Sequence, residues 1–263
     1  SMPTTATLEP LLAGDASAIL REQLSQAAWI VLVGTADHLV LECLRGLKAP
    51  VLVVEPDQGV LEERAEAAAA SGLEGIAFLE QLVGANAKEV SWYRYNDPRL
   101  NGVEPLSDLK PRYPNLSLEA VEVRRQVSLA ELLHAWEPAQ VDCGVLVLPE
   151  QAGLDWLDGA VPCLRRLRAL AWQWVESWRT PLQQQLDAVL ADCWLVPQLD
   201  EALPRLSPMV WRRDPALHFQ ATVLTQRDQL LKQVQMLEDH QVALVTERDG
   251  VMSERDALSN QVA

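Results

Sequence analysis

The stretch AWIVLVG, residues 28–34, decides the fold. It is a continuous apolar run that ends in glycine, without the apolar–polar alternation of a strand that has one wet face. The stretch PVLVVE, residues 50–55, repeats the pattern and ends in a carboxylate. Apolar residues at helical spacing over 37–47 lie between the two runs, so the order is strand, helix, strand. Strands buried on both faces are typical of parallel sheets, in which crossover helices join the strands.

The same alternation continues on both sides of these two strands. Further helices are expected at 15–26, 58–71, 128–136, 152–160 and 181–193. Further strands are expected at 76–83, 90–95, 120–126, 141–148 and 167–175, with an edge hairpin of 194–199 and 209–213. The pattern predicts an α/β domain over 15–215 with a doubly wound, mostly parallel, Rossmann-like sheet. Residues 1–14 are expected to form a flexible N-terminus, in which Ser1-Met2 resembles the remnant of a cleaved tag.

The composition narrows the classes of function. Hydrophobic residues make up 49% of the 263 residues, which allows a packed core and excludes a globally disordered chain. The formal net charge of −15 argues against a nucleic-acid partner, because neutralising phosphates requires clustered Lys and Arg. No apolar run approaches the roughly 18 residues that a spanning helix needs, so no membrane span is expected.

The four cysteines lie far apart in apolar contexts, and no CxxC pair occurs. This spacing predicts no metal site. Free thiols are typical of a reducing compartment, and the N-terminus has no basic segment followed by an apolar stretch. A cytoplasmic location is therefore expected.

Residues 222–263 carry a different period. Apolar side chains recur there at seven-residue steps, which we label the d positions: Val223, Leu230, Leu237, Leu244, Val251 and Leu258. The a positions between them hold Arg227, Val234, Gln241, Arg248, Arg255 and Val262. The period persists for more than five heptads without a proline, and it indicates a coiled coil.

Self-association through this coiled coil is the expected protein partnership. Arginine at a weakens the seam, whereas apolar residues at the neighbouring e positions, such as Leu231 and Met252, widen the apolar stripe. A dimer, a trimer and a helix that packs back on the α/β domain are all compatible with this pattern.

Two residues of the first βαβ unit have the geometry of a nucleotide site. Gly34 directly follows the first buried strand, where the lack of a side chain lets a ligand approach the backbone. Glu55 closes the second strand about 20 residues later, where a carboxylate can accept both hydroxyls of a ribose. No GxxxxGK[ST] sequence occurs, which excludes a P-loop.

Several short motifs follow these residues in a fixed order. They are VEPD at 54–57, YND at 95–97, VSLAELL at 127–133, VDCGVLVLPEQAG at 141–153 and LDGA at 157–160. Their order and spacing resemble the FkbM-type methyltransferases, over about residues 29–213. The resemblance implies a class I methyltransferase fold, S-adenosylmethionine as the cofactor, and a hydroxyl of a glycan or small molecule as the methyl acceptor.

The resemblance also implies site residues. It assigns cofactor binding to Gly34, Thr35, Glu55 and Pro56. It assigns catalysis to Asp97 and Glu150, with Asp97 positioning a hydroxyl or accepting its proton. The alternative for Asp97 is an Asx turn in front of Pro98.

Departures from the family pattern support a second hypothesis. The family's first motif, approximately DVGANxG, stands here as LVGTADH at 32–38, with His38 in place of the second glycine. A later motif, approximately KIDVEGAE, stands here as VLPEQAG around Glu150. A catalytically inactive head that serves as a binding or assembly module through its coiled coil is therefore the alternative to an active enzyme.

Overall fold

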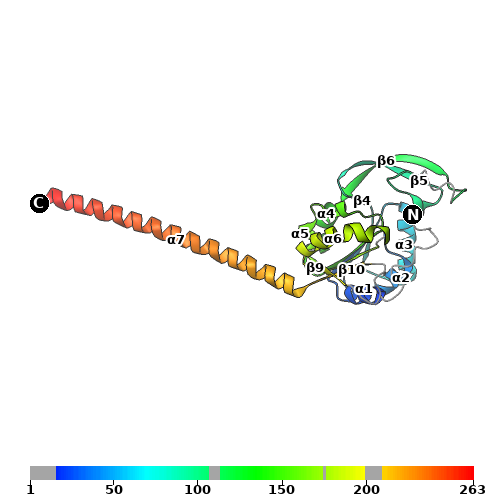
Figure 1. Ribbon diagram of the computed structural model, residues 1–263, viewed down its shortest axis with the longest axis horizontal. Coiled ribbons are helices and arrows are strands. Elements are labelled where there is room, and N and C mark those ends of the chain that lie inside the picture. Colours follow the sequence, from blue (N-terminus) through cyan, green and yellow to red (C-terminus); the bar gives the residue numbers. More distant parts are fainter. Residues whose placement is uncertain (1–15, 107–112, 174–175, 199–208) are drawn as a thin grey trace. The chain divides into compact units, whose positions relative to one another are not determined.

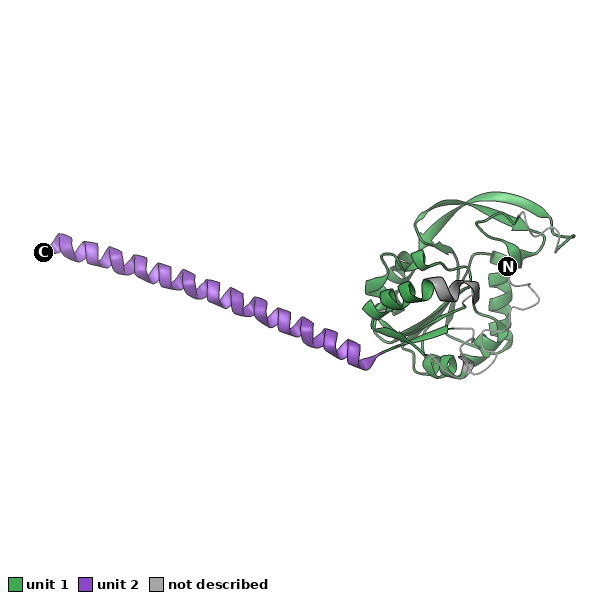
Figure 2. Cartoon of the chain, viewed as in Figure 1, with its two compact units in different colours: residues 1–213 green, residues 214–263 purple. Residues whose placement is uncertain are grey.

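The computed structural model describes residues 16–106, 113–173, 176–198 and 209–263. The chain divides into two compact units, residues 1–213 and residues 214–263 (Figure 2). The predicted flexible N-terminus, 1–14, lies outside the described residues, as does Asp15, the expected first residue of a helix.

A seven-stranded, mostly parallel sheet forms the centre of the first unit (Figure 1). Its strands are β1 (Trp29–Val33), β2 (Val51–Glu55), β3 (Ile76–Glu80), β7 (Gly144–Leu148), β8 (Leu167–Trp172), β9 (Leu195–Pro197) and β10 (Met209–Arg213). They lie in the order β3-β2-β1-β7-β8-β10-β9, and β10 runs antiparallel to both of its neighbours. The predicted doubly wound sheet with an edge hairpin is confirmed.

Helices cover both faces of this sheet. One face packs against α1 (Ala16–Ser25), α2 (His38–Cys43) and α3 (Gln58–Ala70), and the other against α4 (Leu129–Ala135), α5 (Val161–Leu164) and α6 (Glu176–Asp192). Alternate residues of each strand supply the two cores: Ile30 and Leu32 belong to the first, whereas Val31 and Val33 belong to the second. Burial on both faces explains why β1 and β2 are apolar throughout.

A second, three-stranded sheet was not expected from the sequence. It consists of β4 (Leu82–Gly84), β6 (Leu118–Ser128) and β5 (Lys88–Tyr95), in that order. The predicted single strand 76–83 is wrong, because the chain leaves the central sheet at Gln81 and β4 pairs with the end of β6 instead. Short 3-10 helices complete this unit: η2 (Pro98–Leu100), η4 (Glu137–Gln140) and η5 (Leu154–Leu157), the last within the expected helix 152–160.

Two helices begin earlier than predicted. Helix α6 begins at Glu176, which puts Pro181 inside the helix rather than in its first turn. Helix α7 (Pro215–Val262) begins seven residues before the heptads, because Asp214 caps it by accepting from Ala216 N at 2.8 Å and Pro215 suits the first turn. No described helix is both long and apolar enough to cross a bilayer.

Candidate functional site

The candidate site lies at the carboxyl edge of the central sheet, where the strand order reverses. From β1 the sheet continues to β2 and β3 on one side, and to β7 and β8 on the other. Ligands of open α/β sheets bind outside the carboxyl ends of the strands at such a switch point. Gly34 follows β1 here, Glu55 ends β2, and Pro149 follows β7.

Gly34 lies between the ends of the two neighbouring strands. Its amide donates to Val54 O at 2.9 Å, so Gly34 lies beside Glu55, as the sequence predicted. On the β7 side, a side-chain carbon added to Gly34 would lie 3.3 Å from Pro149 Cβ. Its backbone φ of +64° also favours glycine. The glycine is therefore explained by its backbone and by Pro149, without a ligand.

Glu55 is a buried carboxylate that lacks a complete set of partners. The residue is only 6% exposed, and its Oε1 accepts no hydrogen bond. Arg64 of α3 lies nearby, with its Nε 3.9 Å from Oε1 and also without a hydrogen bond. Burial raises the pKa of Glu55 to about 7, against the opposing effect of Arg64. A donor placed between these groups would satisfy the carboxylate.

Thr35 supplies a second buried polar atom at this edge. The residue is 5% exposed, and its hydroxyl has no hydrogen-bond partner. The chain then turns, with Asp37 N donating to Thr35 O at 3.0 Å, and enters α2. Asp37 Oδ1 accepts from the amides of Leu39 and Val40. Thr35 and Glu55 are thus buried hydrogen-bonding side chains at the ends of adjacent strands.

The second sheet holds the segment that follows β2. Arg124 of β6 donates to the carbonyl of Pro56, and its Nη2 lies 3.7 Å from a carboxylate oxygen of Glu80. The same guanidinium stacks over the ring of Trp92 at 4.9 Å. Pro56, predicted to contact the cofactor, therefore has its carbonyl occupied by this arginine.

Asp57 links the same segment to the loop after β5. One of its carboxylate oxygens caps α3 by accepting from Val60 N at 3.1 Å. The other accepts from Asn101 Nδ2 at 3.1 Å. The side-chain Oδ1 of Asn101 in turn accepts from Tyr95 N at 2.7 Å.

Asp97 has the local contacts of a turn residue. Its carboxylate accepts from Arg99 N and from the Arg99 guanidinium, the shortest contact being 2.7 Å. The arginine holds the pKa of Asp97 below its usual range. This geometry is the Asx turn weighed as the alternative, and it leaves the carboxylate poorly suited to take up a proton.

Glu150 lies in the turn after β7, one residue beyond Pro149. It is half-buried, and burial raises the pKa of its carboxyl. A raised pKa suits a group that accepts a proton near neutral pH. Of the two predicted catalytic residues, Glu150 lies next to the switch point, whereas Asp97 lies at the end of β5.

The sequence did not predict a place at this edge for three further residues: Arg64, Arg124 and Pro149. Arg64 lies in a helix whose apolar and polar residues show little separation, so nothing indicated which residues face β2. The contacts of Arg124 could not be predicted, because this residue lies in β6 of the second sheet, which the sequence did not reveal. Pro149 did carry a signal, because it directly follows the apolar strand 144–148 and so had to lie at the carboxyl edge.

Comparisons with known proteins give structural likeness only. No protein-family model matches the sequence, and neither does any curated protein. An rRNA methylase from Streptococcus thermophilus is 11% identical, with 77% of this chain and 99% of that chain covered and a TM-score of 0.41. A ribosomal protein L11 methylase from Lactobacillus delbrueckii subsp. bulgaricus is 14% identical, with 75% and 77% covered and a TM-score of 0.37. A methyltransferase from Pyrococcus furiosus is 8% identical, with 75% and 81% covered and a TM-score of 0.35. At these identities and TM-scores the likeness indicates no function.

Proposed function

We propose that the α/β unit binds S-adenosylmethionine at the carboxyl edge of β1 and β2 and methylates a hydroxyl of a glycan or small molecule, as an FkbM-like enzyme. The observation that supports this best is Glu55, a buried carboxylate with an unsatisfied oxygen at the end of β2. A ribose diol would supply the missing donors, and the free hydroxyl of Thr35 lies on the adjacent strand end.

The chain's own residues would then have separate roles. The cofactor, when bound, supplies an electrophilic methyl group. Glu55 would fix the ribose, and Glu150 would receive the proton that leaves the acceptor hydroxyl. Asp97 would orient the acceptor rather than take its proton, because Arg99 stabilises its ionised form. Rate enhancement would come mainly from alignment of the acceptor oxygen with the methyl group.

A second candidate function is a non-catalytic head that has kept the fold. Two observations favour it: Pro149 fills the space beside Gly34, and Arg64 partly neutralises Glu55. Both groups belong to the protein itself and occupy part of the space and charge that a ligand would complement at this edge. The two functions differ in one measurable property, the affinity for the cofactor.

Calorimetric titration of the whole chain with S-adenosylmethionine tests the proposal. We expect saturable binding, and we expect Glu55→Ala to weaken it roughly 5- to 150-fold, because unpaired ribose hydroxyls cost about 1–3 kcal/mol. Glu63→Ala, on the exposed side of α3, is the matched control and should leave the affinity unchanged. Binding should weaken as the pH falls through 7, since the hydroxyls need an ionised acceptor and the pKa of Glu55 is about 7.

The results separate the two functions. Absence of binding at millimolar cofactor identifies the head as non-catalytic. Binding that Glu55→Ala leaves intact would reject the assigned ribose contact, even if the protein proves to be a methyltransferase.

A further inference from the structure

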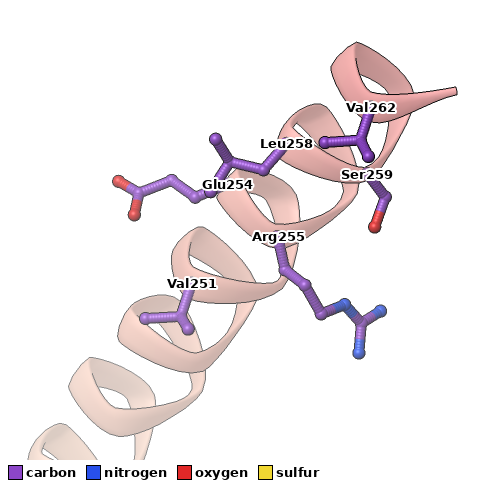
Figure 3. A pocket seen from close by; sticks show the side chains of 6 residues that line it. All are labelled: Val251, Glu254, Arg255, Leu258, Ser259 and Val262. Carbon is purple, nitrogen blue, oxygen red and sulfur yellow. The ribbon is translucent and has the colours of Figure 1, made fainter.

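Helix α7 has a shallow hollow on its surface, and the residues that line it occupy the a, d, e and g positions of the heptad. Figure 3 shows the side chains around it near the end of the helix: Val251, Glu254, Arg255, Leu258, Ser259 and Val262. In the heptad these are two d, two a, one g and one e position. No residue of α7 is buried, and the d residue Leu258 is 63% exposed.

The six residues make up two adjacent holes of a coiled coil. A side chain at a of a facing helix enters a hole formed by four residues at d, g, a and d, here Val251, Glu254, Arg255 and Leu258. A side chain at d enters the next hole, formed by the residues at a, d, e and a that end with Val262. The surface therefore fits a second helix with the same repeat.

We propose that α7 pairs with α7 of a second copy of this chain, as a parallel, in-register, two-stranded coiled coil. The d layers would contain four leucines and two valines, each facing its counterpart. These side chains are 44–68% exposed in the single helix, and they leave water when the second copy binds.

Charge complementarity supports the parallel orientation. In a parallel pair, each a residue enters a hole on the partner helix. One residue of that hole is the partner's g residue, which directly precedes the partner's own a residue at the same level. Arg248 would therefore meet Glu247 of the second copy, and Arg255 would meet Glu254 of the second copy. In the single helix these arginines bond only Asp249 and Asp256, through exposed contacts of 2.9 and 2.8 Å. Exposed pairs of this kind are weak and are readily exchanged.

An antiparallel pair of the same length loses these contacts. With full overlap, Arg248 would lie opposite Leu230, and Arg255 opposite Val223. The e residue Glu238 would meet Glu238 of the second copy at the centre. The three a-position arginines of each helix would face apolar residues, and the two Glu238 side chains would face each other. In the parallel pair the arginines of one a layer face each other, but Arg248 and Arg255 each reach a glutamate at g, which favours the parallel orientation.

The a residues also favour two helices over three. The guanidinium groups of Arg227, Arg248 and Arg255 must reach solvent while their aliphatic stems cover the seam. In a dimer the a position is open on one side, whereas a third helix would enclose it and bury the charge. Leucine at d agrees with two strands. In a parallel pair the two α/β units precede the coiled coil at the same end of it.

Charge exchange between copies tests the pairing directly. We expect the whole chain to sediment as a dimer at tens of micromolar. The double variant Glu247→Lys with Glu254→Lys has only cations at positions 247, 248, 254 and 255. The double variant Arg248→Glu with Arg255→Glu has only anions at the same four positions. Each double variant should raise the dissociation constant of the dimer at least about tenfold, a change of about 1.4 kcal/mol. An equimolar mixture should dimerise again, because each cationic residue then meets an anionic one on the other chain.

A control and a cross-link complete the test. Asp239→Lys with Thr246→Lys and Ser253→Lys makes the same change in charge at the outer f positions, away from the arginines, and should leave the dimer intact. Leu258→Cys should form a disulfide with Leu258→Cys of the second copy under mild oxidation, whereas Ser253→Cys at f should not, because the disulfide requires Cα atoms within about 7 Å. A monomeric or trimeric wild-type chain, a mixture that stays monomeric, or no cross-link at position 258 overturns the proposal.

Discussion

At the scale of single residues, the carboxyl edge of the sheet buries polar groups that lower the stability of the folded protein. Glu55 is buried with one oxygen unsatisfied, and the nearby Arg64 is too distant for a hydrogen bond. A carboxylate held in this way destabilises the folded state, which is common where a side chain is kept for binding. The sequence predicted the place of Glu55 from strand order, but not Arg64, because the contact depends on the rotation of α3 about its axis.

The pH dependence of stability should reveal the cost of Glu55. Its pKa is about 7 in the folded state and near its ordinary value of 4.5 in the unfolded state, so the folded protein holds the proton more tightly. The free energy of unfolding should therefore fall as the pH rises from about 4.5 to 7, and remain reduced above 7. Glu55→Gln removes the titration and should raise stability by about 1–3 kcal/mol at pH 8, with little effect near pH 4.5.

Urea unfolding of both proteins at the two pH values measures this difference. Glu63→Gln, on the exposed side of α3, should show the same stability as the wild type at both pH values. A stabilisation by Glu55→Gln that is equal at pH 4.5 and pH 8 would mean that burial does not raise the pKa of this carboxyl.

At the scale of elements, local patterns predicted strands at 90–95 and 120–126 as well as those of the central sheet, but not that β5 and β6 form a second sheet. Continuous apolar runs identified β1, β2 and β7, since each is buried on both faces. The pairing of β4 with β6 joins residues 82–84 to residues 126–128, and no local period encodes a contact at that separation. For the same reason the contacts of Arg124 with Pro56 and Trp92 could not be foreseen.

The pairing of β1 with β7 depends on one glycine. Gly144 lies opposite Trp29, and a side-chain carbon added to Gly144 would lie 2.0 Å from the indole ring. The ring cannot easily move, because it is fully buried, its Nε1 donates to Val141 O at 2.8 Å, and it packs in a T-shaped arrangement with the ring of Trp136. We expect Gly144→Ala to lower the free energy of unfolding by about 1–3 kcal/mol, measured by urea denaturation.

Gly102→Ala provides the comparison for this substitution. A side-chain carbon added to Gly102 would meet no atom within 4 Å, and its backbone does not adopt a positive φ. Its effect should stay within about 0.5 kcal/mol. If both substitutions lower the free energy of unfolding equally, Gly144 does not stabilise the protein by leaving room for the Trp29 ring.

At the scale of the whole molecule, the two units owe their stability to different sources. The α/β unit has two cores, one on each face of the sheet, and no residue of α7 belongs to either. The heptads of residues 222–263 predicted a long helix, and the structure shows it. The start at Pro215 was missed because the first seven residues of α7 lie outside the repeat, although Asp214 and Pro215 are a recognisable helix start.

Truncation after Gln220 should therefore leave the α/β unit as stable as in the whole chain. The deleted part of α7 contributes no buried side chain, so the melting midpoint of the α/β unit should change by less than about 2 °C. Circular dichroism should lose the helical signal of residues 221–262, and sedimentation should change from dimer to monomer. A destabilised or aggregating truncated chain would show instead that α7 packs on the α/β unit, and that its apolar stripe is covered within one chain.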